Sequence, residues 1–190
     1  MAIDYVAELI EALSSNNRDR RGLARQQLVA IGPSVVDMLI PLVAADDGWA
    51  AVEAAHILGE LSDLRAYPVL VNAIRSRNPL LAGRAVQSVL NYTGQDLASD
   101  LLAVLPHAHV ITQQAILNAL RRLNDPATVP YLLEQLQRTT SPLIRCVIIQ
   151  TLGKVGDATL IPRLTDFMWD DDHHVRDWAV EVIKQLEMRG

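Results

Sequence analysis

Apolar residues recur along this chain at spacings of three and four, which place them on one side of an α-helix. Ile144, Ile148, Leu152 and Val155 form one such stripe. Short polar segments separate the stripes, and a proline often stands in the first turn of the next one, where its missing N–H costs nothing. The pattern therefore predicts pairs of short helices joined by polar turns at residues 16–17, 46–48, 77–79, 139–142 and 170–172.

One motif repeats along the whole sequence. Segments 58–70, 120–132 and 152–164 carry Leu, Asp, Pro and Leu at identical offsets, and the first leucine has equivalents at intervals of 30 to 32 residues. A single helical hairpin of this kind cannot bury its apolar face, so neighbouring hairpins must stack. The sequence thus predicts an all-α fold, an α-solenoid of about six antiparallel helical hairpins with a period of about 31 residues.

These six units leave no room for a second domain or a long linker. We therefore predict a single repeat domain over residues 1–190, with repeats at about 2–32, 33–62, 63–94, 95–124, 125–156 and 157–188.

Two segments, 54–63 (AAHILGELSD) and 151–157 (TLGKVGD), resemble the HEAT repeat, and are most similar to the short bacterial subtype named for phycobilisome lyases. The resemblance covers the whole chain and is stronger in repeats two, five and six. It implies a right-handed α-α superhelix whose second helices line the concave face. Such motifs are specific for a fold and nearly silent about function.

Composition narrows the class of protein. Apolar residues make up 50% of the chain but aromatic residues only 4%, which suits closely packed helices with small residues at their contacts. The formal net charge of −5 argues against a general nucleic-acid binder, because neutralising phosphates requires positive charge. The single cysteine, Cys146, cannot form an internal disulfide, which favours a reducing compartment. No basic, apolar leader opens the sequence, and polar residues interrupt the uncharged stretch 101–120, so we expect a soluble cytoplasmic protein with no membrane partner.

Aligning the second helices by the repeated leucine gives polar columns four residues apart, which share one helical face. An ordinary solvated face and a partner-binding ladder are both compatible with any one of these residues. For the face as a whole we favour binding, and the basic residues of repeats three to five favour an acidic or carbonyl-rich partner segment. The predicted ladder comprises His56, Glu60, Arg84, Ser88, Tyr92, Gln114, Asn118, Arg122, Gln150, Lys154 and Glu181.

Aromatic residues gather near the carboxyl end. Trp169, Trp178 and the nearby Val182 have no following repeat to pack against. They either cover the end of the core themselves or remain exposed for a partner or for self-association.

Candidate chemistry is sparse. Residues 170–174 (DDDHH) suggest a metal cluster, but acids at a helix start are better explained as N-caps, and we predict no metal or other cofactor. Cys146 is better explained as a structural thiol than as a nucleophile. Within the HEAT resemblance, deoxyhypusine hydroxylases use His-Glu dipeptides as iron ligands, and this chain has no such dipeptide.

We predict no catalytic residue. We predict that the chain is a non-catalytic protein–protein interaction scaffold or adaptor that binds a partner in the concave groove. The alternative is a phycobilin lyase-like subunit that handles a linear tetrapyrrole or its carrier protein.

Overall fold

A computed structural model describes residues 2–189, and within them the chain forms twelve α-helices and six short 3-10 helices with no β-strand. The predicted all-α fold is therefore confirmed. The helices group into two compact units, unit 1 ending at Leu97 and unit 2 beginning at Ala98. Each of the six predicted repeats contains one pair of successive helices. The handedness, the period and the single repeat domain stay predictions.

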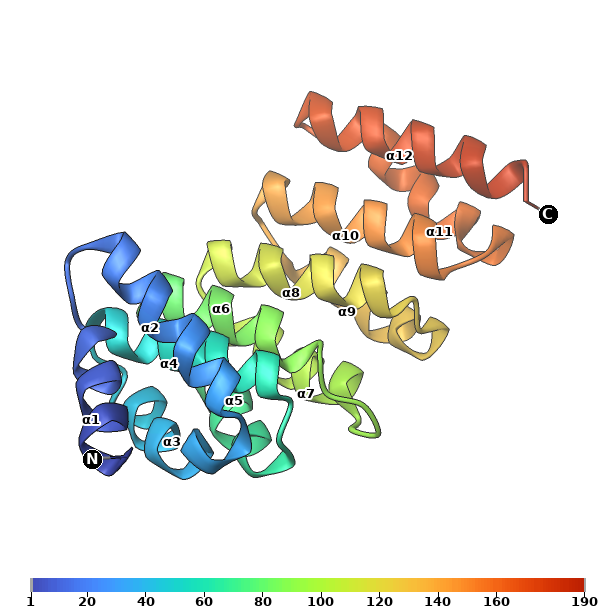
Figure 1. Cartoon of the computed structure of the whole chain (residues 1–190). Helices are drawn as coiled ribbons and strands as arrows, with labels where there is room; N and C mark the ends of the chain where they lie inside the picture. Colours follow the sequence, from blue (N-terminus) through green and yellow to red (C-terminus); the bar gives the residue numbers. More distant parts are fainter. Residues whose placement is uncertain (1, 190) are drawn as a thin grey trace. The chain divides into compact units, whose positions relative to one another are not determined.

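Unit 1 contains three helical hairpins in two layers (Figure 1). The second helices, α2 (Arg18–Ile31), α4 (Gly48–Leu61) and α6 (Pro79–Val89), lie side by side. The first helices, α1 (Ala2–Ala12), α3 (Val36–Ala45) and α5 (Tyr67–Ala73), each pack against the second helix of their own hairpin. Two 3-10 turns, η1 (Pro33–Val35) and η2 (Leu64–Ala66), lead into α3 and α5.

Unit 2 repeats this arrangement with α8 (Val110–Leu123), α10 (Pro142–Val155) and α12 (His173–Glu187) as neighbouring second helices. The first helices of unit 2 are shorter than its second helices, and 3-10 turns precede or extend them. They are α7 (Leu97–Val104) with η3 (Leu105–His107), α9 (Val129–Arg138) after η4 (Pro126–Thr128), and α11 (Ile161–Leu164) between η5 (Ala158–Leu160) and η6 (Thr165–Trp169).

Side-chain caps explain where many of these helices begin. The repeated aspartates Asp63, Asp125 and Asp157 each accept a hydrogen bond from the backbone N–H two residues later, at the start of η2, η4 and η5. The predicted proline follows within the first turn of α5, α9 and α11. Asp172 caps α12 in the same way. Asp47, by contrast, precedes α4 without a side-chain cap bond.

Glycine lets neighbouring second helices approach closely. A Cβ on Gly59 of α4 would lie 2.5 Å from the Cβ of Ser88 on α6, and a Cβ on Gly153 of α10 would lie 2.7 Å from a methyl group of Val182 on α12. Val182 is buried, so the alternative in which it remains exposed at the end of the chain is wrong. These close contacts account for a core built from aliphatic residues with few aromatic rings.

Among residues 2–189, no single helix is both long and apolar enough to cross a membrane. One pair of helical segments bent by 108°, Arg18–Ile31 with Pro33–Ala45, passes the same test jointly, by length and composition only.

Candidate functional site

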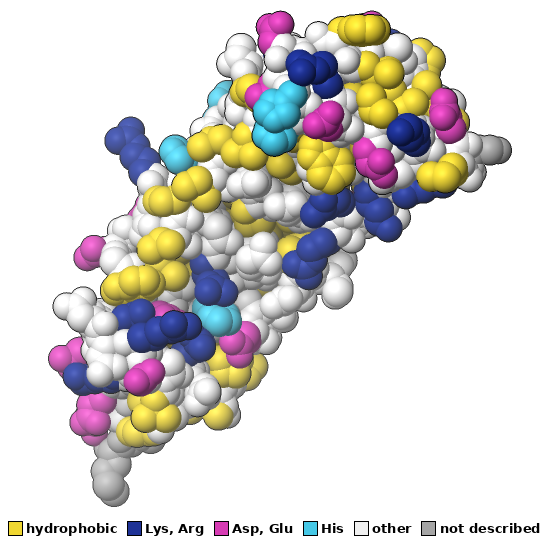
Figure 2. Space-filling view, turned by 90° about the horizontal axis from the view of Figure 1, so that it is seen from above, with side chains coloured by type: hydrophobic (Ala, Val, Ile, Leu, Met, Phe, Trp, Pro, Cys, Tyr) yellow, Lys and Arg dark blue, Asp and Glu magenta, His cyan; other side chains and the backbone are white. Residues whose placement is uncertain are grey.

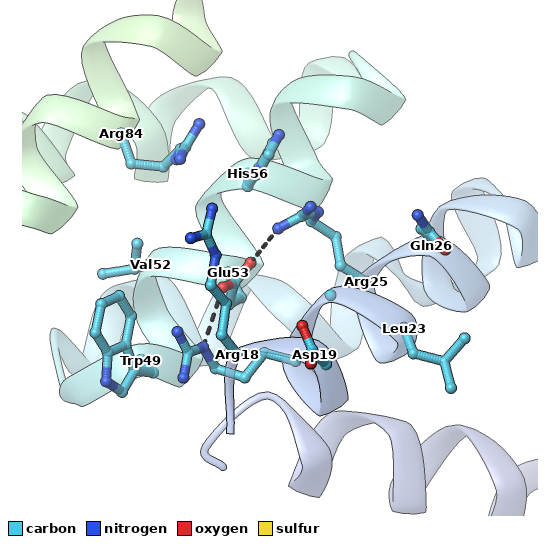
Figure 3. A pocket seen from close by; sticks show the side chains of 12 residues that line it. Arg18, Asp19, Leu23, Arg25, Gln26, Trp49, Val52, Glu53, His56 and Arg84 are labelled. Carbon is cyan, nitrogen blue, oxygen red and sulfur yellow. Dashed lines mark hydrogen bonds and ion pairs between the residues drawn. The ribbon is translucent and has the colours of Figure 1, made fainter. Parts of the chain in front are cut away.

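A pocket of about 760 Å³ opens between α2, α4 and α6 of unit 1, and half of the residues that line it are charged. The space-filling view in Figure 2 shows basic side chains gathered beside a histidine in this part of the molecule. Figure 3 shows that Arg84 enters from α6, whereas Arg18 and Arg25 enter from α2. The residues lining this unit 1 pocket are Arg18, Asp19, Arg21, Gly22, Leu23, Arg25, Gln26, Trp49, Val52, Glu53, His56 and Arg84.

A buried carboxylate holds two of these arginines. Glu53 accepts a hydrogen bond from Arg21 Nε at 3.2 Å and another from Arg25 Nη1 at 2.8 Å. Arg21 is itself buried, donates to the carbonyl of Ser15 at 2.8 Å, and stacks on Trp49 with its guanidinium carbon 4.0 Å from a ring centroid. Burial alone raises the pKa of Glu53, but the hydrogen bonds from the two arginines outweigh burial and hold the pKa below its ordinary value.

The pocket carries more positive than negative charge. Its lining includes four arginines but only two carboxylates, those of Asp19 and Glu53. Both Glu53 oxygens are used by Arg21 and Arg25. Among the described residues, Arg18 and Arg84 have no carboxylate within ion-pair distance, so two guanidinium groups remain available.

His56 sits at the edge of this charge cluster and is held by Glu60, whose Oε1 lies 2.9 Å from His56 Nε2. Burial lowers the pKa of His56, and the positive charges of Arg84 and Arg25 lower it further, against the opposite effect of Glu60 and Glu53. The buried Nδ1 has no hydrogen-bond partner among the described residues. The ring is therefore neutral near pH 7 and adds no charge to the pocket.

The structure separates the predicted ladder residues of unit 1. His56 and Arg84 line the pocket, and Glu60 is exposed beside it. Ser88 and Tyr92 are buried, so their predicted place in a solvent-facing ladder is wrong. Their hydroxyls instead donate to the carbonyls of Ala55 and Leu58, which joins α6 and the segment after it to α4.

In unit 2 the three ladder residues with amide side chains line the same pocket. Gln114, Asn118 and Gln150 line a pocket of about 420 Å³, and Arg121 donates to the side-chain oxygens of Asn118 at 3.0 Å and Gln150 at 3.1 Å. Lys154 lines an adjacent pocket of about 200 Å³ that shares Gln150. Two further ladder residues, Arg122 and Glu181, are exposed but line neither pocket.

The two carboxyl-terminal tryptophans differ in exposure. Trp169 is 84% exposed, so it does not cover the end of the core. Trp178 is 39% exposed and lines both unit 2 pockets. Self-association through this end of the chain stays a prediction.

The acidic segment before α12 has structural partners. Asp170 pairs with Arg145 at 2.8 Å, and Asp172 caps the helix. Over residues 2–189 no three His, Cys, Asp or Glu side chains converge in a way that would hold a metal ion. Burial, followed by the charges of Asp172 and Asp170, raises the pKa of the Cys146 thiol, which disfavours the reactive thiolate.

Sequence reasoning missed most of the unit 1 pocket. Residues 18–21 are not among the predicted ladder residues, yet they begin α2, and Arg21 is buried. A positional signal was present. Repeats one, five and six carry an arginine seven residues before the position of the repeated leucine, which is Ile183 in repeat six. These arginines, Arg21, Arg145 and Arg176, all donate to carbonyls of the preceding turn.

Comparison with known proteins fits this architecture. A family model described as HEAT repeats matches residues 98–184, within unit 2. This segment of unit 2 therefore resembles HEAT repeats. The resemblance of the chain to HEAT-repeat proteins is thereby confirmed, while its assignment to the phycobilisome lyase-like subtype stays a prediction. A sequence comparison with curated proteins gives no match.

Solved structures resemble the fold of this chain at low sequence identity. An engineered protein is 17% identical with a TM-score of 0.58, covering 96% of this chain and 98% of that one. Human deoxyhypusine hydroxylase is 15% identical with a TM-score of 0.55, covering 97% and 96%. A phycocyanin lyase complex of CpcE and CpcF from Nostoc sp. is 19% identical, covering 95% and 98%, but its TM-score of 0.47 carries no argument. These likenesses show the fold alone.

Proposed function

We propose that the chain is a non-catalytic scaffold that binds another protein through the face formed by its second helices. The observation that carries this proposal is the unit 1 pocket, where α2, α4 and α6 together surround about 760 Å³ with four arginines, Trp49 and apolar side chains. Arginine and tryptophan are the residue types that contribute most often to strong protein–protein contacts.

The second helices of unit 2 support the same role. Their pockets combine the exposed Leu143 and Trp178 with the amides of Gln114, Asn118 and Gln150. Such a mixture of apolar surface and amide groups suits a peptide backbone, which offers both hydrogen-bond donors and acceptors. Helical repeat proteins in general present extended surfaces of this kind to partners.

Site-specific photo-crosslinking in cells tests the proposal. A photoreactive amino acid replaces Leu23, which lines the unit 1 pocket and is 57% exposed. The matched control replaces Leu64, which is 59% exposed in the same unit but lies outside the pocket. We expect protein adducts from position 23 that position 64 does not give. Identical adducts from both positions, or none from position 23, would contradict the proposal.

The tetrapyrrole alternative has a direct test of its own. The chain is co-expressed with a bilin-producing pathway, purified, and its visible absorbance measured. A scaffold without chromophore chemistry gives a colourless protein. Stoichiometric visible absorbance would instead favour the lyase-like function.

A further inference from the structure

We propose that the unit 1 pocket recognises an acidic segment of the partner protein, and that Arg18 and Arg84 contact its carboxylates. This inference rests on the proposed function, and it assigns the chemistry of the partner. The carrying observation is that one pocket holds two arginines without a carboxylate partner, next to a cluster in which Glu53 balances one of the two charges of Arg21 and Arg25.

The cluster around Glu53 explains why we assign the contacts with the partner's carboxylates to Arg18 and Arg84 and not to Arg21 and Arg25. Arg21 is buried and bonded to Glu53, to Ser15 and to the face of Trp49, so it is fixed within the protein. Arg25 shares the same carboxylate. Glu53 thereby neutralises about one of these two charges, and the neutral His56 adds none. Arg18, Arg84 and the remaining cluster charge leave a net positive site that only Asp19 opposes.

Arg84 is placed to make such contacts strong. It is half-buried on α6, where a charge-assisted hydrogen bond is less screened by solvent than on an open surface. Arg18 is exposed at the start of α2 and lines the same pocket. Two planar guanidinium groups on different helices suit two or more carboxylates along one peptide segment.

The size and lining of the pocket favour a peptide over a small anion. Its volume of about 760 Å³ lies within the range of about 300–1,000 Å³ typical of ligand sites. Leu23, Val52 and Trp49 add apolar walls that an inorganic anion would not use. A nucleic acid is disfavoured because the whole chain carries a net charge of −5, which repels a long polyanion.

Fluorescence anisotropy with a labelled hexaglutamate peptide tests this inference on the full chain. At an ionic strength of about 50 mM we expect saturable binding of hexaglutamate and none of hexalysine or a Gly-Ser hexamer. Arg84→Glu and Arg18→Glu are each expected to weaken binding at least about tenfold, the loss expected for a charge-assisted hydrogen bond. Arg18 is exposed, so its variant keeps the test valid if Arg84→Glu does not fold.

The matched control is Arg77→Glu, which makes the same charge change at an exposed arginine of unit 1 outside the pocket. We expect this variant to weaken binding by less than about twofold. The inference fails if hexaglutamate does not bind, if Arg77→Glu weakens binding as much as Arg84→Glu, or if a labelled single-stranded oligonucleotide binds more tightly than hexaglutamate. Adducts specific to position 23 together with no hexaglutamate binding would reject the acidic partner and leave the scaffold standing.

Discussion

At the scale of single residues, the central feature of the site is the buried carboxylate of Glu53, which accepts hydrogen bonds from two arginines of α2. Glu53 is 8% exposed, and such a group is tolerated only because both of its oxygens accept charged hydrogen bonds. Its role is to position Arg21 and Arg25 and to neutralise one of their two charges. Arg18 and Arg84 are thereby left as the available charges of the pocket.

Glu53→Gln is expected to lower the free energy of unfolding by about 2–3 kcal/mol at pH 7, because it leaves the buried Arg21 without its counter-charge. The pKa of Glu53 is lowered in the folded chain, so its contribution is complete above the ordinary value of 4.5 and is lost as the pH falls below it. Urea unfolding at pH 7 and pH 3 measures both effects.

Glu60→Gln serves as the control, since Glu60 is exposed and pairs only with His56. It is expected to change stability by less than about 1 kcal/mol. Equal losses for the two variants at pH 7 would show that Glu53 does not have the assigned role.

The pKa of His56 reports on the charge of the pocket. Burial and the charges of Arg84 and Arg25 lower it below its ordinary value, against Glu60 and Glu53. Arg84→Gln removes one of these positive charges, so the pKa of His56 should rise. An NMR titration of the imidazole signals, with His56→Gln to assign them, measures the shift. An unchanged pKa would place Arg84 too far from His56 to belong to the same site.

At the scale of elements, the spacing between second helices is set by residues without bulky side chains. Gly59 of α4 faces Ser88 of α6, and Ser88 donates to the carbonyl of Ala55 at 2.7 Å. This contact brings α6, and Arg84 on it, close to α4. The geometry of the unit 1 pocket therefore depends on a packing contact that lies outside it.

Gly59→Ala is expected to destabilise the chain by about 1–3 kcal/mol, because the new methyl group would overlap Ser88 and force α4 and α6 apart. Gly83→Ala in α6 is the matched control. A Cβ at Gly83 meets nothing within 4 Å, so alanine there should stabilise the helix by about 0.5–1 kcal/mol. Thermal unfolding of both variants separates a steric cost from a general effect of glycine replacement, and a stabilising Gly59→Ala would refute the close contact.

The elements themselves were largely predictable from the sequence. Apolar spacing, capping residues and early prolines act within a few residues. Asp63, Asp125 and Asp157, which recur at one offset of the repeated motif, cap the starts of η2, η4 and η5. Which polar side chains are buried was harder to predict from the sequence, because their burial depends on contacts with the neighbouring repeat. Ser88 and Tyr92 are polar in sequence, yet both satisfy their hydroxyls on carbonyls of α4, 33 and 34 residues away.

At the scale of the whole molecule, second helices supply most of the lining of the unit 1 pocket and of the two unit 2 pockets that hold the amides and Lys154. The alignment of the second helices by the repeated leucine included Arg84, which lines the unit 1 pocket, but assigned the basic surface to repeats three to five. The alignment missed Arg21 and Glu53. They lie 32 residues apart, so predicting their ion pair requires knowing which helix faces pack together. The structure brings α2, α4 and α6 around one pocket and so moves the candidate site toward repeats one to three.

The most direct test of this account is quantitative affinity capture from the native cell with three baits: the unaltered chain, Arg84→Glu and Arg77→Glu. The account predicts at least one protein with an acidic segment that the unaltered chain and Arg77→Glu retain equally. Arg84→Glu should recover at least about tenfold less of it. The same proteins captured in equal amounts by all three baits would contradict a charge-based partner site in the unit 1 pocket.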